Sequence, residues 1–144
     1  MTSTPAPRSD YPGGPPPGAP RDVVILGSTG SIGTQALDLV RRNPDRFRVV
    51  ALAAGGGNPG LLARQAVEFG VRAVAVASPA AAESVRAALA DFAQTGPAQT
   101  GPTPVVTAGP DAVTELAACQ CDVVLNGVDG AAGLRATLAA LEAG

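Results

Sequence analysis

From Arg21 onward, short aliphatic runs alternate with longer segments of helical period, and this alternation limits the possible fold more than any other feature. The first run, residues 23–26, is Val-Val-Ile-Leu and is followed by Gly27. An uninterrupted aliphatic run of this kind is typical of a parallel strand that is buried on both faces. Helical spacing follows over residues 31–42, which close with two arginines. The pattern predicts an α/β fold.

The alternation continues through five strand-helix units. We expect further strands at residues 48–54, 73–77, 105–107 and 122–126, and further helices at residues 61–69, 79–92, 111–118 and 133–143, with Asp111 as an N-cap. This order predicts a Rossmann-like, doubly wound, mainly parallel sheet flanked by helices. Another strand should follow the helix that ends at Gly144, so the fold is expected to be truncated after the fifth strand-helix unit.

The N-terminal segment has a different composition. Half of the 14 prolines lie between Pro5 and Pro20, and aliphatic side chains are nearly absent there. Such a segment buries too little apolar surface to offset the conformational entropy lost on ordering. We therefore expect residues 1–20 to form a disordered Pro/Gly-rich tail and residues 21–144 to form one domain. No apolar stretch typical of a secretory signal precedes Val23, so a cytoplasmic location is expected.

Composition also argues against several classes of function. A net charge of -2 gives no basic face for nucleic acid, and no apolar run is long enough for a membrane span. We expect neither nucleic acid nor a membrane as a partner. The 10 basic residues are all arginines, which excludes a Walker-type phosphate lysine. Cys119 and Cys121 form an isolated C-x-C, which we interpret as two small buried side chains and not as a metal or redox site.

A glycine-rich segment joins the first strand to the first helix. Residues 27–33, Gly-Ser-Thr-Gly-Ser-Ile-Gly, are called the first glycine turn below. A pyrophosphate needs backbone N–H donors without a Cβ in the way, and a helix N-terminus offers unpaired N–H groups and a partial positive charge. Thr29 and Ser31 add hydroxyl donors, while Gly33 lets the helix pack close to the strand. The segment predicts a dinucleotide site, and a purely structural turn is the alternative.

The end of the second strand indicates which dinucleotide is bound. An NAD site usually places Asp or Glu there to hold the ribose 2′-hydroxyl. This chain instead has Gly55, Gly56, Gly57 and Asn58. No carboxylate would repel a 2′-phosphate, and backbone N–H groups and the Asn58 amide can donate, so NADP(H) is favoured over NAD(H). No arginine stands at this position, and Arg64, the nearest candidate, is more typical of a solvated helix residue.

A second segment repeats the glycine spacing. Residues 127–133, Gly-Val-Asp-Gly-Ala-Ala-Gly, again join a strand to a helix and are called the second glycine turn. Asp129 would place a like charge beside a phosphate, and one dinucleotide needs a single pyrophosphate cradle. Two interpretations remain open. The turn either allows tight packing of strand and helix, or its backbone lines the ribose or nicotinamide side of the same cofactor.

Four segments together resemble one family. They are the first glycine turn, Asn-Pro-Asp-Arg-Phe-Arg-Val-Val-Ala at 43–51, Val-Val-Leu-Asn-Gly at 123–127 and Thr-Leu-Ala-Ala-Leu-Glu-Ala-Gly at 137–144. In this order and spacing, the chain resembles the N-terminal, dinucleotide-binding part of the 1-deoxy-D-xylulose 5-phosphate reductoisomerase family. The resemblance covers about residues 21–144. Glycine motifs alone would also fit semialdehyde dehydrogenases or short-chain dehydrogenases, so the other segments single out the family.

The resemblance implies a function in non-mevalonate isoprenoid biosynthesis. It implies an NADPH-dependent oxidoreductase and isomerase that converts the phosphosugar 1-deoxy-D-xylulose 5-phosphate to 2-C-methyl-D-erythritol 4-phosphate. A divalent metal, Mg or Mn, and a homodimer at full length are implied as well. The family's cofactor contacts fall on Thr29, Gly30, Ser31, Ile32, Gly55, Gly56, Gly57 and Asn58. Some members have a lysine where this chain has Gly56 or Gly57.

The same resemblance implies that the chemistry is performed by residues that this sequence does not contain. The family's Asn-Lys-Glu-Ser segment and metal carboxylates follow the Leu-Glu-Ala-Gly helix end, so we assign no catalytic and no metal-binding residue. The acidic residues of the predicted helices are interpreted as solvated: Asp38, Glu68, Glu83, Glu115 and Glu142. The chain is interpreted as a fragment that is inactive by itself. A free-standing nucleotide-binding module and the cofactor domain of another NADP oxidoreductase remain as alternatives.

Overall fold

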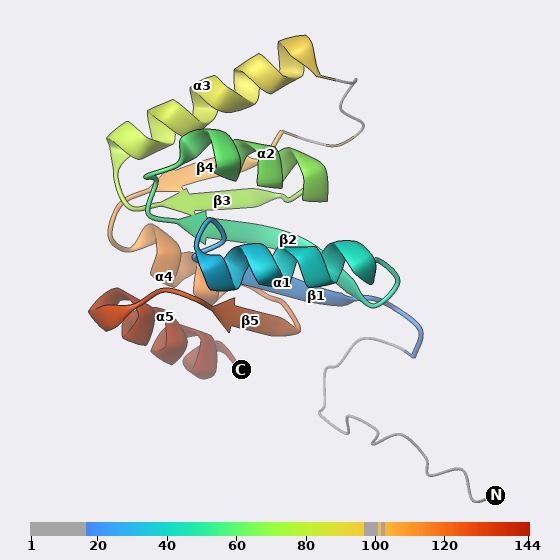
Figure 1. Ribbon diagram of the computed structural model, residues 1–144. Helices are drawn as coiled ribbons and strands as arrows, with labels where there is room; N and C mark the ends of the chain where they lie inside the picture. The colour runs from blue at the N-terminus through green and yellow to red at the C-terminus, as the bar shows by residue number, and fades with distance from the viewer. Residues whose placement is uncertain (1–16, 97–100, 102) are drawn as a thin grey trace, which may run out of the picture.

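A single parallel sheet forms the centre of the molecule. The computed structural model describes residues 17–96, 101 and 103–144. Its strands are β1 (Arg21–Leu26), β2 (Phe47–Ala54), β3 (Ala73–Val76), β4 (Val105–Ala108) and β5 (Val123–Asn126). They lie side by side in the order β4-β3-β2-β1-β5, and every pair is parallel (Figure 1). The predicted Rossmann-like sheet is confirmed.

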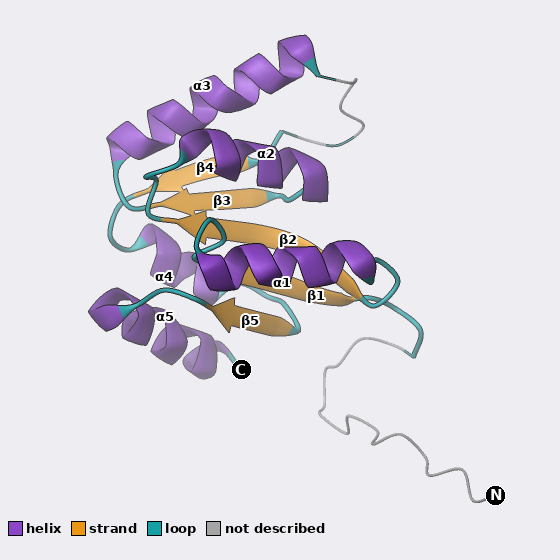
Figure 2. Ribbon diagram, in the orientation of Figure 1, coloured by secondary structure: helices purple, strands orange, loops and turns teal. Residues whose placement is uncertain are grey.

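Helices cover both faces of this sheet (Figure 2). The helices α1 (Ser31–Arg42), α2 (Pro59–Phe69) and α3 (Pro79–Thr95) pack on one face, and α4 (Ala112–Ala117) and α5 (Gly130–Ala143) pack on the other. The first four strands therefore progress in one direction, and α4 carries the chain back so that β5 pairs with β1. The strand order reverses between β1 and β5. Open α/β sheets bind ligands at such a reversal, outside the carboxyl ends of the strands.

The core explains why the first strand has no polar residue after Asp22. Val23 and Ile25 pack under α1 and α2, while Val24 and Leu26 pack toward α4 and α5. All four side chains are buried, because successive side chains of a strand point to opposite faces. The aliphatic run is therefore a strand buried on both faces, as predicted. The edge strand β5, in contrast, is only half-buried along its length.

Several helix boundaries differ from the sequence predictions. Helix α2 begins at Pro59 because the Asn58 carbonyl Oδ1 accepts a hydrogen bond from the Leu61 N–H at 3.2 Å. Helix α5 begins at Gly130 and not at Gly133. Asp111 is the N-cap residue of α4, as predicted, but its side chain does not cap the helix. Its backbone is already helical, with φ −91° and ψ −15°, and its carboxylate makes no capping hydrogen bond.

The predicted N-terminal tail falls mostly on residues that the structure does not describe. It covers residues 1–20, of which 1–16 lie outside the described residues; residues 17–20 form a turn that leads into β1. Within the described part of the chain, each helix is too short or too polar to cross a bilayer.

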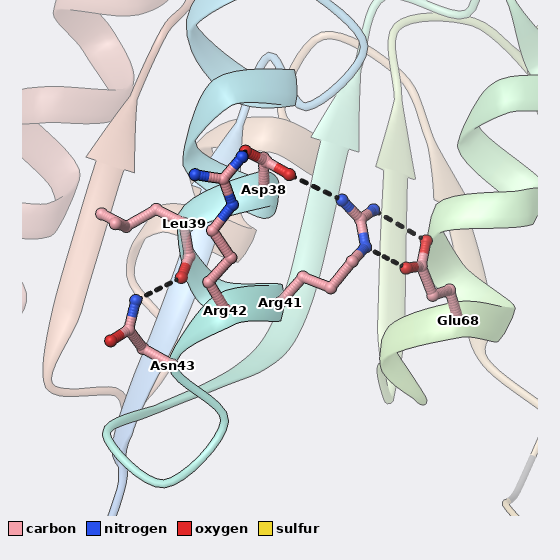
Figure 3. A network of polar contacts seen from close by, with 6 residues as sticks. All are labelled: Asp38, Leu39, Arg41, Arg42, Asn43 and Glu68. Atoms are coloured by element: carbon pink, nitrogen blue, oxygen red, sulfur yellow. Dashed lines mark hydrogen bonds and ion pairs between the residues drawn. The ribbon is translucent and has the colours of Figure 1, made fainter.

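A polar network ties the C-terminal turn of α1 to α2 (Figure 3). Arg41 points at the Glu68 carboxylate with two nitrogens, and its Nη2 donates to Glu68 Oε2 at 3.0 Å. Arg41 Nη1 also contacts Asp38 at 3.3 Å, and Arg42 pairs with the same carboxylate at 2.9 Å. All of these side chains are largely exposed, so the network stabilises the fold little. Its acidic members are thus held by arginines on the protein surface, as expected for a solvated face.

Candidate functional site

Both glycine turns lie together at the reversal of strand order. The first follows β1 and the second follows β5, and the Gly127 N–H donates to the Leu26 carbonyl at 2.8 Å. A Cβ added to Gly27 would lie 2.9 Å from the Gly127 carbonyl oxygen. The exposed side chain of Ile32 lies beside Gly127, in the first turn of α1. The arrangement therefore brings residues 100 positions apart to one edge of the sheet.

Two of the glycines in the first turn are required by the chain's own structure. Gly27 has a φ of +78°, a conformation that side-chain-bearing residues rarely adopt. A Cβ on Gly33 would clash with the Gly27 carbonyl oxygen and with the Ser28 backbone. The predicted role of Gly33 is therefore confirmed: it lets α1 pack directly against the turn. Hydrogen bonds from the Gly27 and Ser28 N–H groups to the Ala53 carbonyl, at 2.7 and 3.0 Å, fix the turn to the end of β2.

Gly30 is different, because nothing inside the described chain requires a glycine there. Its φ of −79° and ψ of 176° are extended backbone that any residue can adopt. A Cβ at this position would meet only the Gly27 carbonyl oxygen, at 3.4 Å, which is an ordinary contact. The residue is exposed at the mouth of the turn. Because Gly30 has no side chain, the space beside its Cα at the protein surface stays free.

The N-terminus of α1 faces that space with unpaired donors. Gly30 is its N-cap residue and supplies no side-chain cap, and the first turn contains no acidic residue. The first N–H groups of a helix, here those of Ser31 and Ile32, have no intrahelical acceptor. The Thr34 hydroxyl donates to the Gly30 carbonyl at 2.9 Å and so does not occupy these N–H groups. The turn therefore offers donors and a partial positive charge to an anion.

The buried amide side chain of Gln65, on α2, supports the first glycine turn through a hydrogen bond. Gln65 is 5% exposed, and its Nε2 donates to the Ser28 carbonyl at 3.0 Å. Ser28 itself is fully buried. Sequence reasoning missed Gln65, although a polar residue on the apolar face of α2, beside Leu62 and Ala66, was a usable signal. Buried amides are retained where they satisfy a buried backbone group.

Residues 55–58, called the β2 turn below, connect β2 to α2. Gly56 has a φ of +98°, and a Cβ there would clash with the Ala81 side chain, so this glycine is required by the fold. Gly55 and Gly57 are exposed and have open space around the position of a Cβ. Asn58 uses its carbonyl oxygen to cap α2, which leaves its amino group as a donor.

An apolar cavity of about 430 Å³ opens beside the β2 turn. It lies at the carboxyl ends of β2, β3 and β4, on the face covered by α4 and α5. Small or apolar residues line most of it: Ala53, Ala54, Gly55, Ala77, Gly109, Pro110, Val113, Thr114, Val128, Ala131 and Ala132, together with Arg135. Gly55 is the one predicted contact residue in this lining. The other seven, Thr29, Gly30, Ser31 and Ile32 on the first glycine turn and Gly56, Gly57 and Asn58 on the β2 turn, are not part of it.

The second glycine turn is held by its own strand. Asn126 Nδ2 donates to the Gly133 carbonyl at 2.6 Å and to the Thr137 hydroxyl at 2.8 Å, and its Oδ1 accepts from the Val128 N–H at 3.0 Å. Gly130 has a φ of +74°, and a Cβ on Gly133 would clash with the Val128 carbonyl. These contacts support the structural interpretation of the turn. Because Val128 also lines the cavity, the second interpretation remains compatible with the structure.

Metal and thiol chemistry find little support in the described residues. Within them, no three His, Cys, Asp or Glu side chains come close enough together to hold a metal ion. Cys119 and Cys121 are half-buried free thiols between α4 and β5. Burial, with a smaller contribution from neighbouring Cys119, raises the pKa of Cys121 to about 11. Both thiols stay protonated at neutral pH, which fits their interpretation as small packing residues.

Comparison with known proteins points to one family. The sequence model of the family described as 1-deoxy-D-xylulose 5-phosphate reductoisomerase matches residues 23–144. Among curated relatives, the reductoisomerase of Streptomyces coelicolor is 58% identical over 125 residues, which are 87% of this chain and 29% of the relative. The reductoisomerase of Mycolicibacterium smegmatis is 56% identical over 129 residues, or 89% of this chain and 28% of the relative. The chain thus spans about 30% of the length of these relatives.

Solved structures agree with this match. The reductoisomerase from Zymomonas mobilis in complex with NADPH superimposes with a TM-score of 0.74 at 38% identity, over 87% of this chain and 30% of that one. A DOX-P reductoisomerase in complex with magnesium gives a TM-score of 0.76 at 30% identity, over 88% of this chain and 29% of that one. The topology described above is therefore shared with the corresponding third of these enzymes.

Proposed function

Because this chain belongs to the 1-deoxy-D-xylulose 5-phosphate reductoisomerase family, we propose that it is the NADPH-binding domain of such an enzyme. The Zymomonas mobilis relative binds NADPH, and its likeness covers 87% of this chain. The proposed contacts are those that the sequence predicted: Thr29, Gly30, Ser31, Ile32, Gly55, Gly56, Gly57 and Asn58. The family match favours this reading over the cofactor domain of another NADP oxidoreductase.

Gly30 is the observation that carries the proposal. A glycine with ordinary backbone angles and free space at its Cβ position has no internal role in this fold. A pyrophosphate seated on the N-terminus of α1 would use that space, because a side chain there would block the approach of its oxygens. Gln65 supports the same reading, since it holds the Ser28 carbonyl inward and so fixes the backbone that presents the donors.

The two halves of the cofactor then extend to either side of the first glycine turn. The β2 turn and the apolar cavity beside it would hold the adenosine half, since the cavity has a volume suited to a small-molecule group. The alanines of its lining would cover the adenine ring. Ile32 and Gly127, at the reversal between β1 and β5, would contact the nicotinamide half. The second glycine turn contributes backbone to this path but does not hold the pyrophosphate.

The absence of an acidic side chain on the β2 turn supports a preference for NADPH over NADH. Residues 55–58 contain no Asp or Glu to accept the ribose 2′-hydroxyl or to repel a 2′-phosphate. Gly55 and Gly57 are exposed, so their backbone N–H groups can approach a phosphate. The Asn58 amino group adds one further donor.

Calorimetric titration of the chain with NADPH and with NADH tests the proposal. We expect NADPH to bind at least about tenfold more tightly, a difference of about 1.4 kcal/mol. Equal affinities, or a preference for NADH, would overturn the assignment of the β2 turn. A chain that is folded by circular dichroism but binds neither dinucleotide would overturn the proposed function itself.

The reaction proposed for the whole enzyme is the conversion of 1-deoxy-D-xylulose 5-phosphate to 2-C-methyl-D-erythritol 4-phosphate. NADPH, when bound, supplies the hydride for the reduction. This chain's own residues bind and orient the dinucleotide, and the apolar lining of the cavity keeps water from its adenosine half. The divalent metal of the family would need carboxylates that the described residues do not bring together, so we assign it no ligand here.

A polypeptide of these 144 residues is therefore expected to show no reductoisomerase turnover. Positioning of the substrate against the nicotinamide can account for roughly 7 to 11 kcal/mol of barrier lowering, and we assign no residue to that task. The assay adds substrate, magnesium and NADPH to the purified chain and follows the absorbance of the reduced nicotinamide. Substrate-dependent oxidation of NADPH in preparations free of longer enzyme would show that catalytic residues lie within this chain.

A further inference from the structure

The apolar cavity contains one charged side chain whose role is not explained by the fold. Among the described residues that line the cavity, Arg135 alone carries a charge, and it makes no hydrogen bond or ion pair with another described side chain. The other exposed arginines of α1 and α3, in contrast, pair with acidic neighbours on the surface. Arg64 on α2 also has no side-chain partner among the described residues, so what distinguishes Arg135 is its place in the lining of an apolar cavity, where its charge can bind an anionic ligand.

The geometry of α5 directs this side chain toward the edge where the cofactor is proposed to bind. Side chains of a helix tilt toward its N-terminus and cover the preceding turn. For Arg135 that turn contains Ala131 and Ala132, whose methyl groups leave room for a long side chain to lie across them. The N-terminus of α5 follows β5 at the carboxyl edge of the sheet. Arg135 thus lines the cavity from the same side of α5 as Ala131 and Ala132.

The same cavity is also lined by Ala54 and Gly55 at the end of β2. In Rossmann-like folds this strand end meets the adenosine ribose and decides between a 2′-hydroxyl and a 2′-phosphate. The β2 turn itself offers only neutral donors, since residues 55–58 include no basic side chain. A 2′-phosphate carries nearly two negative charges, and neutral donors alone compensate them poorly. Arg135, in the same cavity lining, has the complementary charge.

We propose that Arg135 binds the 2′-phosphate of NADPH and so determines the choice of cofactor, an inference that rests on the proposed function. A guanidinium can hold a phosphate through two parallel N–H···O bonds, and the apolar lining strengthens the pairing because it excludes water. Arg64, the nearest basic residue in sequence to the β2 turn, does not line the cavity and lies on the helix α2, which packs on the other face of the sheet. The specificity-determining cation comes from α5.

The test measures dissociation constants of the full chain and its variants for NADPH, NADH, 2′,5′-ADP and 5′-AMP by calorimetry. We expect Arg135→Leu to weaken the affinity for NADPH and for 2′,5′-ADP about 30-fold. The affinities for NADH and 5′-AMP should change less than about twofold, because neither ligand has a 2′-phosphate. Arg135→Lys should restore part of the NADPH affinity, because it keeps the charge without the planar fork. Arg64→Leu is the matched control, and it should change NADPH affinity less than about threefold.

Other outcomes separate this inference from the proposed function. If Arg135→Leu lost equal affinity for NADPH and for NADH, the proposed role of Arg135 would be overturned, because the guanidinium would then contact the adenine ring that both cofactors share. An unchanged NADPH affinity would overturn it as well. If the unaltered chain binds none of the four ligands, the proposed function fails first. Thermal melts of Arg135→Leu should match those of the unaltered chain, since Arg135 is exposed and has no partner among the described side chains.

Discussion

The two glycine turns share a spacing and a place in the fold, yet they use their glycines differently. Both follow a strand, both open a helix, and both pack their third glycine against a carbonyl of the turn. They differ at the middle glycine. Gly130 has a φ of +74° and is required by its backbone, whereas Gly30 has extended angles that any residue could adopt. The middle position therefore distinguishes a structural turn from one that leaves space for a ligand.

The residues around the two turns also differ, and the difference again favours phosphate binding at the first turn. The first turn has no acidic residue at the start of its helix, and the second has Asp129 at the N-cap of α5. The first is held by Gln65 from another helix, and the second is held by Asn126 from its own strand. Identical spacing is therefore weak evidence for phosphate binding. The charge at the helix N-terminus and the free space at the middle glycine are better indicators of phosphate binding.

The largest expected effect concerns the third glycine of each turn, which packs against a backbone carbonyl in both. Gly33→Ala and Gly133→Ala should each lower the free energy of unfolding by about 3 kcal/mol, because the added methyl group meets backbone that cannot move aside. Urea denaturation measures this loss. Gly60→Ala, on α2 with open space around it, is the control and should raise stability slightly. If either turn variant is as stable as the unaltered chain, close packing is not the reason for its third glycine.

The next largest effects are expected when the middle glycine of each turn, Gly30 or Gly130, is replaced by valine. Gly30→Val should weaken NADPH binding about 30-fold, or about 2 kcal/mol, since the branched side chain fills the space proposed for the pyrophosphate. Its effect on unfolding should stay below about 1 kcal/mol. Gly130→Val should do the reverse: a positive φ costs about 1 to 2 kcal/mol of stability, and the NADPH affinity should change little. Calorimetry and thermal melts on both variants decide, and a Gly30→Val variant with full affinity would make the first turn purely structural.

A smaller effect is expected from the two amides that hold the turns. Gln65→Leu and Asn126→Leu should each lower the free energy of unfolding by about 1 to 2 kcal/mol, because each leaves backbone groups without their partner. Gln65→Leu alone should also weaken NADPH binding, by about fivefold or about 1 kcal/mol. The pair is compared by denaturation and titration in parallel. Equal NADPH affinities of the two variants would contradict the proposed role of Gln65 in presenting the donors.

The smallest expected effect tests whether phosphate avoids the second turn. Asp129→Asn should change NADPH affinity less than about twofold, because Asp129 is exposed and lies on the second turn, which we propose does not hold the phosphates, so that solvent and salt screen its charge. Titrations at low and at high salt measure it. A tenfold gain in affinity that disappears at high salt would show that the second turn lies against the phosphates, and the comparison between the turns would fail.

Much of this molecule was determined by local sequence. The aliphatic run of β1, the αL glycine after α2 and the prolines that open α2 and α3 each act within a few residues, and the predicted elements are all present. Boundaries were less accurate where a cap decides them. Asn58 extends α2 by two residues, whereas Asp111 is the predicted N-cap of α4 but makes no side-chain capping hydrogen bond, since its own backbone is helical. Local pattern fixes the type of an element, whereas the exact ends depend on single hydrogen bonds.

The sequence by itself also indicated that the first glycine turn, and not the second, is suited to an anion, because Asp129 can be read directly. The sequence also predicted the packing role of Gly33, but only the tertiary structure showed that Gly27 and Gly56 are required by the fold, that Gln65 supports the first turn from α2, and that Arg135 and Gly55 share a cavity. The last two relations join residues 37 and 80 positions apart, through helix packing and the return of the chain to place β5 beside β1. Periodicity and motif spacing report only on neighbours along the chain, so contacts made by packing across the sheet remain outside their reach.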